Sequence, residues 1–469
     1  MSELHNIKSG MFKILIANVI NLIIGLLSSF ILPKFLTVNS YATLKTYQLY
    51  ISYIGILHFG YVDSLYLMYG GQELKKISKD SLRENLSTFQ AFQVGVMGIS
   101  ILLGILLKNS LILAFSISIF PSNMLSFYQC IYQASGEFSL YGRIINSTTL
   151  SYFLLNMFFI FVLHQDNPYL YIGVIIVVNS CICMVLKRNA WKKQKIKFNI
   201  ENINPQLVPY NIKNGILLTL GNLSSILLTG MDRWFVKVCM NNIAFAQYSF
   251  AVSIENFLEV LTSSVTITMY NFFCKISDSK KICDVRNMVM VFAAFIVSCA
   301  FPARLILEVY LTKYIESANV MFLLFGAQIF YIIIKGVYVN LYKAHKRQKE
   351  YFAKLVGVIC IGFIFNVVCY WIKPIKESFA IGTLLSAISW YFMCIYDFKG
   401  LKYSTKEICY PFAQVCVYLI CGICFKAVWG GIAYILISLI ITCALLPEAI
   451  NRIVNMLKQR LTYYSIFQK

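Results

Sequence analysis

Two carboxylates interrupt the apolar stretch 245–274. Glu255 and Glu259 are four residues apart, so both lie on one face of a helix. A charged side chain inside a bilayer costs on the order of 2.5–3.5 kcal/mol and usually faces a protein interior or water. Three interpretations stay open for this pair: ion pairing with Lys335 or Arg233, coupling to H⁺ or Na⁺, or the lining of an aqueous vestibule.

A second apolar stretch, 319–342, has a polar stripe with a cation at its centre. At 100° per residue the polar side chains fall within an arc of about 80°. They are Gln328, Tyr331, Lys335, Tyr338 and Tyr342. Because Lys335 is about 10 Å from the expected helix end, its ammonium group is far from the interface. The stripe therefore predicts the wall of a water-filled cavity, with Gln328, Tyr331 and Tyr338 beside Lys335 as binding residues.

Further charges lie at the end of the stretch 211–230 and within the stretch 44–70. Arg233 follows Asp232, so it either binds an anion or pairs locally with that carboxylate. Lys45 and Asp63 both lie in the stretch 44–70. We expect Lys45 and Arg233 to bind an anionic group, and Asp63 and Asp232 to take part in ion coupling or charge pairing.

The elements that carry these residues are membrane-spanning helices. Hydrophobic residues make up 59% of the 469-residue chain and charged residues only 13%, which excludes a soluble protein and a disordered chain. Apolar runs of roughly 20 residues, the length that crosses a bilayer, recur along the sequence. We predict an all-α fold with about 14 spans, at 11–32, 44–70, 87–107, 111–134, 144–164, 169–187, 211–230, 245–274, 287–307, 319–342, 353–372, 379–396, 410–428 and 431–450.

The formal net charge of +21 follows the loops between these spans. Lys and Arg are about three times as frequent in one alternate set of loops as in the other, as the positive-inside rule requires. The excess is therefore attributed to cytoplasmic loops and not to binding of nucleic acid. It places both termini in the cytoplasm.

The predicted spans form two sets of six followed by two more. A basic, Asn- and Pro-rich linker around 187–209 follows the sixth span. Asn18 and Tyr41 are 23 residues apart, as are Asn222 and Phe245, so the halves resemble a parallel repeat with an offset of 204 residues. We predict an N-lobe with the linker at 1–205, a C-lobe at 206–400, and two further helices with a cytoplasmic tail at 401–469.

Motifs of soluble enzymes are missing from the sequence. It has no GxxxxGK(S/T) phosphate loop, no HExxH zinc motif, no GxSxG nucleophile motif and no dinucleotide fingerprint. Its four His are scattered, and most of its 15 Cys lie in apolar runs, where Cys acts as a small hydrophobe. We therefore expect a transporter and not an enzyme, with no metal and no cofactor apart from a coupling ion.

Two blocks of short motifs resemble a known family. They are ILPKFL (31–36), YIGILHFGYVD (53–63) and YGGQE (69–73) in the first half, and GNLSS (221–225), GMDRWF (230–235) and FAQYSF (245–250) in the second. In this order they resemble the polysaccharide exporters, which belong to the multidrug/oligosaccharidyl-lipid/polysaccharide (MOP) flippase superfamily.

The resemblance implies two six-helix lobes around a cavity that opens alternately to each side of the membrane. It implies a flippase in a bacterial inner membrane that moves an undecaprenyl-diphosphate-linked oligosaccharide, such as an O-antigen or capsule repeat unit, to the outer leaflet. The polymerase and glycosyltransferases of the same pathway would be partners, beside the membrane lipids. Two alternatives stay open: a cation-coupled drug antiporter of the same superfamily, and a membrane-embedded glycan polymerase or ligase.

Overall fold

The regular structure of the protein is helical. The computed structural model describes residues 20–194, 199–275, 278–401 and 403–452, and in these ranges it has helices and no strands. Eleven helices of this part are long and apolar enough to cross a membrane. The predicted all-α, multi-span fold is thereby confirmed.

Each of the 14 predicted spans coincides with helical structure in its described part. The three beyond the eleven are the shorter helix Ile20–Phe35, the 34-residue helix α9 (Asn242–Lys275), and a helix broken into α2 (Val38–Ile51), the 3₁₀ turn η1 (Ile54–His58) and α3 (Tyr61–Tyr69). The break occurs where Phe59 and Gly60 have positive φ values of 52° and 90°. Such backbone angles cannot continue a right-handed helix.

The chain divides into two compact units at Leu227 and Leu228, within α8 (Leu207–Cys239). The sequence-based boundaries at 205 and 400 stay predictions. Unit 1, up to Leu227, contains the helix Ile20–Phe35 and the first part of α8. Its other helices are α2, α3, α4 (Lys79–Leu106), α5 (Ser110–Ala134), α6 (Phe138–Phe161) and α7 (Pro168–Gln194).

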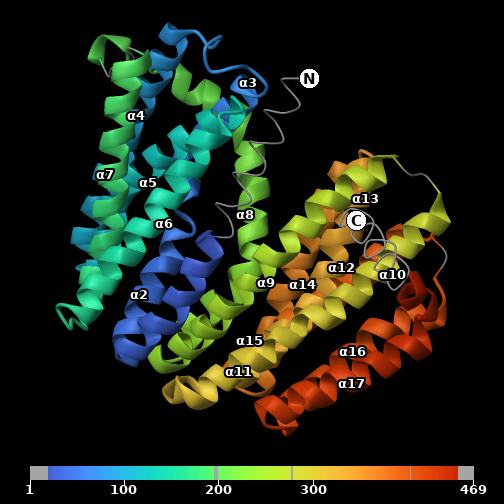
Figure 1. Cartoon of the computed structure of the whole chain (residues 1–469). Coiled ribbons are helices and arrows are strands. Elements are labelled where there is room, and N and C mark those ends of the chain that lie inside the picture. The colour runs from blue at the N-terminus through green and yellow to red at the C-terminus, as the bar shows by residue number, and fades with distance from the viewer. Residues whose placement is uncertain (1–19, 195–198, 276–277, 402, 453–469) are drawn as a thin grey trace, which may run out of the picture. The chain divides into compact units, whose positions relative to one another are not determined.

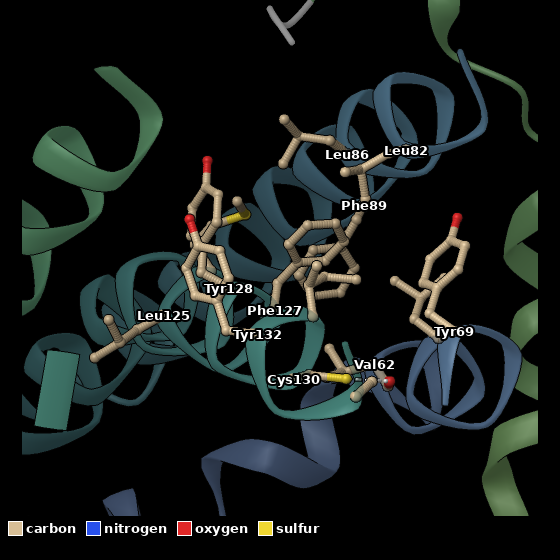
Figure 2. Close-up of a cluster of buried hydrophobic side chains, with 14 of the residues drawn as sticks. Val62, Tyr69, Leu82, Leu86, Phe89, Leu125, Phe127, Tyr128, Cys130 and Tyr132 are labelled. Carbon is tan, nitrogen blue, oxygen red and sulfur yellow. Dashed lines mark hydrogen bonds between the residues drawn. The ribbon is translucent and has the colours of Figure 1, made fainter. Parts of the chain in front are cut away.

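Helix α5 is at the centre of unit 1, where it packs on α3, α4, α6 and α7. Its buried side chains form a core with those of α3 and α4, and Figure 2 shows the rings of Phe89 and Phe127 stacked there, 5.4 Å apart. The described part of the predicted linker also packs on α4, because Asn204 donates hydrogen bonds to Thr88 and Glu84.

Helices α3 and α8 approach each other closely through two glycines. A Cβ atom on Gly215 would lie 1.9 Å from the Gly60 carbonyl oxygen, and one on Gly60 would lie 2.5 Å from the backbone nitrogen of Ile216. Any larger residue at either position would overlap with backbone, so this crossing needs glycine on both helices.

Unit 2 is built around α12 (Ser317–Ile333), whose 17 residues are nearly all apolar or small. It packs on α9, α10 (Ser279–Ile296), α11 (Ala300–Val309), α15 (Lys376–Asp397) and α16 (Thr405–Cys424). The remaining helices are α13 (Val339–Ala344), α14 (Gln348–Ile372) and α17 (Ala427–Leu445). Figure 1 shows the last two helices, α16 and α17, side by side in red.

A buried ion pair joins α16 to α10. Arg286 is fully buried, and its Nη2 atom lies 2.9 Å from Glu407 Oε2. Asn287 donates a 2.6 Å hydrogen bond to the other oxygen of Glu407, which also closes a capping box with Ser404 at the start of α16. The C-terminal helices are thus fixed to the rest of unit 2 by charge as well as by apolar packing.

The two units begin corresponding helices in the same way. Thr37 caps the N-terminus of α2, and Asn241 caps that of α9, where its Oδ1 atom accepts a 2.8 Å hydrogen bond from the Ala244 backbone. These residues are 204 residues apart, which is the offset found in the sequence. Asn18, the first member of the proposed repeat, lies outside the described residues.

Candidate functional site

Helices α8, α9 and α15 bring a carboxylate and two hydroxyl groups together inside unit 2. Asp232 is only 5% exposed. Its Oδ2 atom accepts a 2.6 Å hydrogen bond from the Tyr248 hydroxyl and a 3.4 Å bond from Thr383. Its Oδ1 atom accepts a 2.8 Å bond from the Arg233 backbone. A carboxylate that far from water is retained only with such donors.

A second carboxylate lies near the first. Gln328 of α12 donates a 2.7 Å hydrogen bond from Nε2 to Oε1 of the half-buried Glu255. Glu255 lies two helical turns beyond Tyr248 on α9, so both acidic residues are close to the Tyr248 side of α9. We call Asp232, Tyr248, Glu255, Gln328 and Thr383 the acidic cluster of unit 2.

Lys335 lies two helical turns beyond Gln328, on a π-helical turn formed by Ile334–Tyr338. It is half-buried, and its Nζ atom lies 5.9 Å from the centre of the Tyr331 ring. Tyr331 in turn makes an edge contact with Trp390 of α15. An ammonium group over an aromatic face is stabilised without losing its charge, so it can still attract an anion.

A π-helical turn interrupts the predicted stripe at Ile334–Tyr338, where each turn takes more residues than in an α-helix. Tyr338 packs, fully buried, against Tyr391 and Phe398. Their neighbour Tyr342 is also buried, and it hydrogen-bonds to Asp397. Roles of Gln328, Tyr331 and Tyr338 in substrate binding stay predictions.

Arg233 follows Asp232 on α8 and is the cation next to the acidic cluster of unit 2. Its Nε atom is buried and has no hydrogen-bond partner among the described residues. The contact with Asp232 runs through the Arg233 backbone, as given above. A buried guanidinium nitrogen without an acceptor is suited to an anionic oxygen atom, since Arg–phosphate contacts are strong and directional.

In unit 1 the predicted residue Asp63 lies in the first turn of α3. Thr219 hydrogen-bonds to its Oδ2 atom, and Asn222 lies at 3.5 Å from Oδ1, so both partners come from α8. The negative charge is favourable at a helix N-terminus. Lys45 of α2 is half-buried, with its Nζ atom 5.3 Å from the centre of the Tyr41 ring.

Sequence reasoning missed most partners of these charged groups. Thr219 and Thr383 have no sequence signal, because a hydroxyl in an apolar helix most often bonds to its own backbone. Tyr248 lies in the same predicted span as Glu255, but its bond to Asp232 depends on how α8 and α9 pack. The side chain of Glu259 lies outside the part of the chain that the structure describes.

The described residues contain no group of three or more His, Cys, Asp or Glu placed to hold a metal ion. The arrangement in unit 2 therefore consists of two carboxylates and two cations set among hydroxyl, amide and aromatic groups. Such side chains can hold a diphosphate, a sugar or a small cation, and they offer no activated nucleophile within the described contacts.

No family model and no curated protein sequence matches the chain. Among solved structures it is similar to the lipid II flippase MurJ in an inward closed conformation, with a TM-score of 0.71 and 12% identity over 93% of this chain and 99% of that chain. It is also similar to a mutant of the Vibrio cholerae MATE transporter VcmN, with a TM-score of 0.50 and 14% identity over 84% of this chain and 96% of that one. The chain is thus a multi-pass membrane protein with the fold that MurJ and MATE transporters share.

Proposed function

We propose that the protein is a flippase that moves a polyprenyl-diphosphate-linked oligosaccharide across the membrane by alternating access. The observation that carries the proposal is the fold shared with a lipid II flippase over 93% of the chain. The resemblance of the short motifs to polysaccharide exporters points to the same class. The substrate would be a repeat unit of an O-antigen, a capsule or a related surface glycan.

The cations support a diphosphate substrate. Lys335 and Arg233 both lie in helices of spanning length, where a charge is costly unless it has a role or a partner. The aromatic contact of Lys335 and the unpartnered Nε atom of Arg233 leave both able to meet an anion. Lys45 would play a similar part in unit 1.

The carboxylates support coupling to H⁺ or Na⁺. Asp232 and Glu255 accept hydrogen bonds from Tyr248 and Gln328, which are neutral donors. Such donors do not neutralise a carboxylate, so a proton or a cation could still bind to it. Asp63 and Glu259 are further candidates for this role. Moving one charge through the membrane potential is worth about 2.3 kcal/mol per 100 mV, so a single coupled ion supplies useful work.

The setting follows from the proposed substrate. An undecaprenyl-diphosphate carrier, which the motif resemblance implies, would mean that the protein works in the inner membrane of a bacterium, with both termini in the cytoplasm as the loop charges predict. Glycosyltransferases would supply the loaded carrier and a polymerase would consume it, so these enzymes are the proposed partners.

A cation-coupled antiporter of small molecules is the second candidate. It is favoured by the acidic cluster of unit 2, because buried carboxylates suit an organic cation as well as a coupling ion. The similarity to VcmN supports it less, since it covers less of the chain than the similarity to MurJ does.

A reconstitution experiment separates the two candidates. The purified protein is placed in liposomes with a fluorescent polyprenyl-diphosphate oligosaccharide, and transfer between leaflets is read from quenching by a membrane-impermeant reductant. We expect transfer well above that of empty liposomes. Exchange of a cationic drug for H⁺ or Na⁺ without lipid transfer would instead establish the antiporter, and new glycosidic bonds in the product would establish a polymerase.

A further inference from the structure

Unit 1 contains a cavity far in sequence from the charged residues discussed so far. It has a volume of about 270 Å³ and lies between α4, α5 and α7. Its lining includes Gln90 of α4, Pro121 and Tyr128 of α5, and Cys183 and Lys187 of α7. Ligand sites usually span roughly 300–1,000 Å³, so this one is too small for an oligosaccharide but fits part of an acyl chain.

A proline inside α5 lines the cavity. Pro121 cannot donate the backbone hydrogen bond of a regular helix, which opens the ladder and tends to bend the helix. The Pro121 carbonyl accepts a hydrogen bond from the Cys183 thiol of α7, at 3.1 Å. The side chains of Met124 and Tyr128 line the cavity one and two turns further along α5 and also belong to the core shown in Figure 2.

One polar group in the cavity has no partner. Tyr128 is 95% buried, and its hydroxyl group has no hydrogen-bond partner among the described residues. In Figure 2 the hydroxyl groups of Tyr128 and Tyr132 point away from Val62 and Cys130. A buried hydroxyl is nearly always hydrogen-bonded, so the Tyr128 hydroxyl at the cavity wall is suited to an oxygen atom of a ligand.

The shape and charge of the cavity select a class of ligand. Ser180 and Lys187 both line it and are seven residues apart on α7, so it extends about 10 Å along the helix. Met124, Pro121 and Phe120 make its deep wall apolar, while Lys187 adds a cation at one end. Met184 and Lys187 are exposed, so the cavity is open at that side of the helix.

We propose that this cavity binds an anionic membrane phospholipid. One acyl chain lies along α7 against the apolar wall, the phosphate is held by Lys187, and a glycerol or ester oxygen meets the Tyr128 hydroxyl. No residue of the acidic cluster of unit 2 lines this site, and a bound lipid would fix α5 against α7.

Native mass spectrometry of the full-length protein tests the proposal. Detergent-solubilised protein is titrated with dioleoyl phosphatidylglycerol or with dioleoyl phosphatidylcholine. We expect one phosphatidylglycerol to remain bound at the lowest concentrations, and equal retention of the zwitterionic lipid would overturn the proposed charge selectivity.

Two pairs of neighbouring variants locate the binding. Ser180→Phe fills the cavity, whereas Cys181→Phe adds the same bulk at an exposed position outside its lining. Lys187→Gln removes the lining cation, whereas Arg188→Gln removes its exposed neighbour. We expect the affinity for phosphatidylglycerol to fall about fivefold in Lys187→Gln, because this variant loses the contribution of one basic residue to binding of an anionic lipid. In Arg188→Gln the affinity should change little.

If both members of either pair bind the lipid equally well, the proposed site is wrong. Tyr128→Phe gives a further measurement, since it should weaken binding without changing the cavity. Lipid transfer by the reconstituted protein is measured in parallel, so loss of phosphatidylglycerol binding with transfer intact separates this site from the proposed transport function.

Discussion

The Tyr248 hydroxyl lies 2.6 Å from the Asp232 carboxylate, in the interior of unit 2 and between two helices that are adjacent in the sequence. Thr383 adds a third helix to the same carboxylate. The Asp232 carboxylate therefore accepts hydrogen bonds from three helices, α8, α9 and α15.

Tyr248→Phe should destabilise unit 2. It removes the shortest hydrogen bond to a buried carboxylate, and such bonds contribute about 1.5–3 kcal/mol. The measurement is the denaturant or thermal unfolding midpoint of the purified protein. Tyr66→Phe is the control, because Tyr66 is 39% exposed. Equal midpoints for the two variants would contradict the importance of this bond.

Gly215→Ala should disrupt the crossing of α3 and α8. The added methyl group would overlap with the Gly60 carbonyl, and overpacking of this kind costs about 1–3 kcal/mol or more. The matched control is Gly221→Ala on the same helix, where nothing lies within 4 Å of the added atom. That control should be neutral or slightly stabilising, because alanine favours a helix by about 1 kcal/mol over glycine.

Folded yield by fluorescence size-exclusion chromatography and the thermal midpoint measure both glycine variants. A Gly215→Ala protein as stable as the Gly221→Ala protein would show that the backbones can separate at little cost.

Lys335→Ala should abolish most transport while leaving membrane insertion intact. A hydrogen bond to a charged group contributes about 1.5–3 kcal/mol, so a role in holding the diphosphate predicts a loss of roughly ten- to hundredfold. The readout is lipid transfer in liposomes. Lys343→Ala, at an exposed position of α13, is the control and should retain transport. Full transfer by Lys335→Ala would remove this residue from the mechanism.

Glu255→Gln and Glu259→Gln should change the dependence of transport on pH or Na⁺. Glutamine keeps the shape of the side chain but cannot bind a proton or pair with a cation as a carboxylate does. Transport is measured with imposed H⁺ or Na⁺ gradients, one at a time. If the ion dependence of both variants equals that of the natural protein, the two carboxylates have a structural role.

The loop before α12 provides a test of pH dependence. The pKa of Glu316 lies below its ordinary value of 4.5, because Gln247 and then Lys376 donate hydrogen bonds to its carboxylate. Because the pKa is lowered in the folded protein, this carboxylate makes its full contribution to stability above pH 4.5. The contribution is lost as the pH falls through the folded-state pKa.

Glu316→Gln should therefore lower the unfolding midpoint near neutral pH and have a smaller effect in acid. The contribution is small, at most about 1 kcal/mol, because the side chain is 70% exposed and water screens its charge. Glu377→Gln, next to Lys376, is the control. An equal deficit of Glu316→Gln at neutral and acidic pH would contradict the assignment.

The helices could be predicted from the sequence because the bilayer fixes their length and composition. All 14 predicted spans coincide with helical structure in their described parts, but the break at Phe59 and Gly60 inside the predicted span 44–70 was not predicted. The N-terminal caps at Thr37 and Asn241 have the predicted repeat offset. Such features depend on residues that are close together in the sequence, so a single sequence is enough to predict them.

The partners of the charged residues could not be predicted, because they depend on how helices pack. The periodicity argument for 319–342 assumed a regular helix and missed the π-helical turn at Ile334–Tyr338. Asp63 and Asp232 were identified as charged positions, yet their partners Thr219 and Thr383 are about 150 residues away in the chain. The sequence alone gives neither the distance nor the relative orientation of two side chains that are so far apart in the chain.

Helix α8 runs from Leu207 to Cys239 without interruption, while the boundary between the units falls inside it. The residues just before this boundary weaken the helix locally. Gly221 lowers the helix propensity, and Ser224 bonds back to the Leu220 carbonyl, a contact that loosens and often curves a helical backbone. This stretch of α8 is therefore the part of the helix that bends most easily.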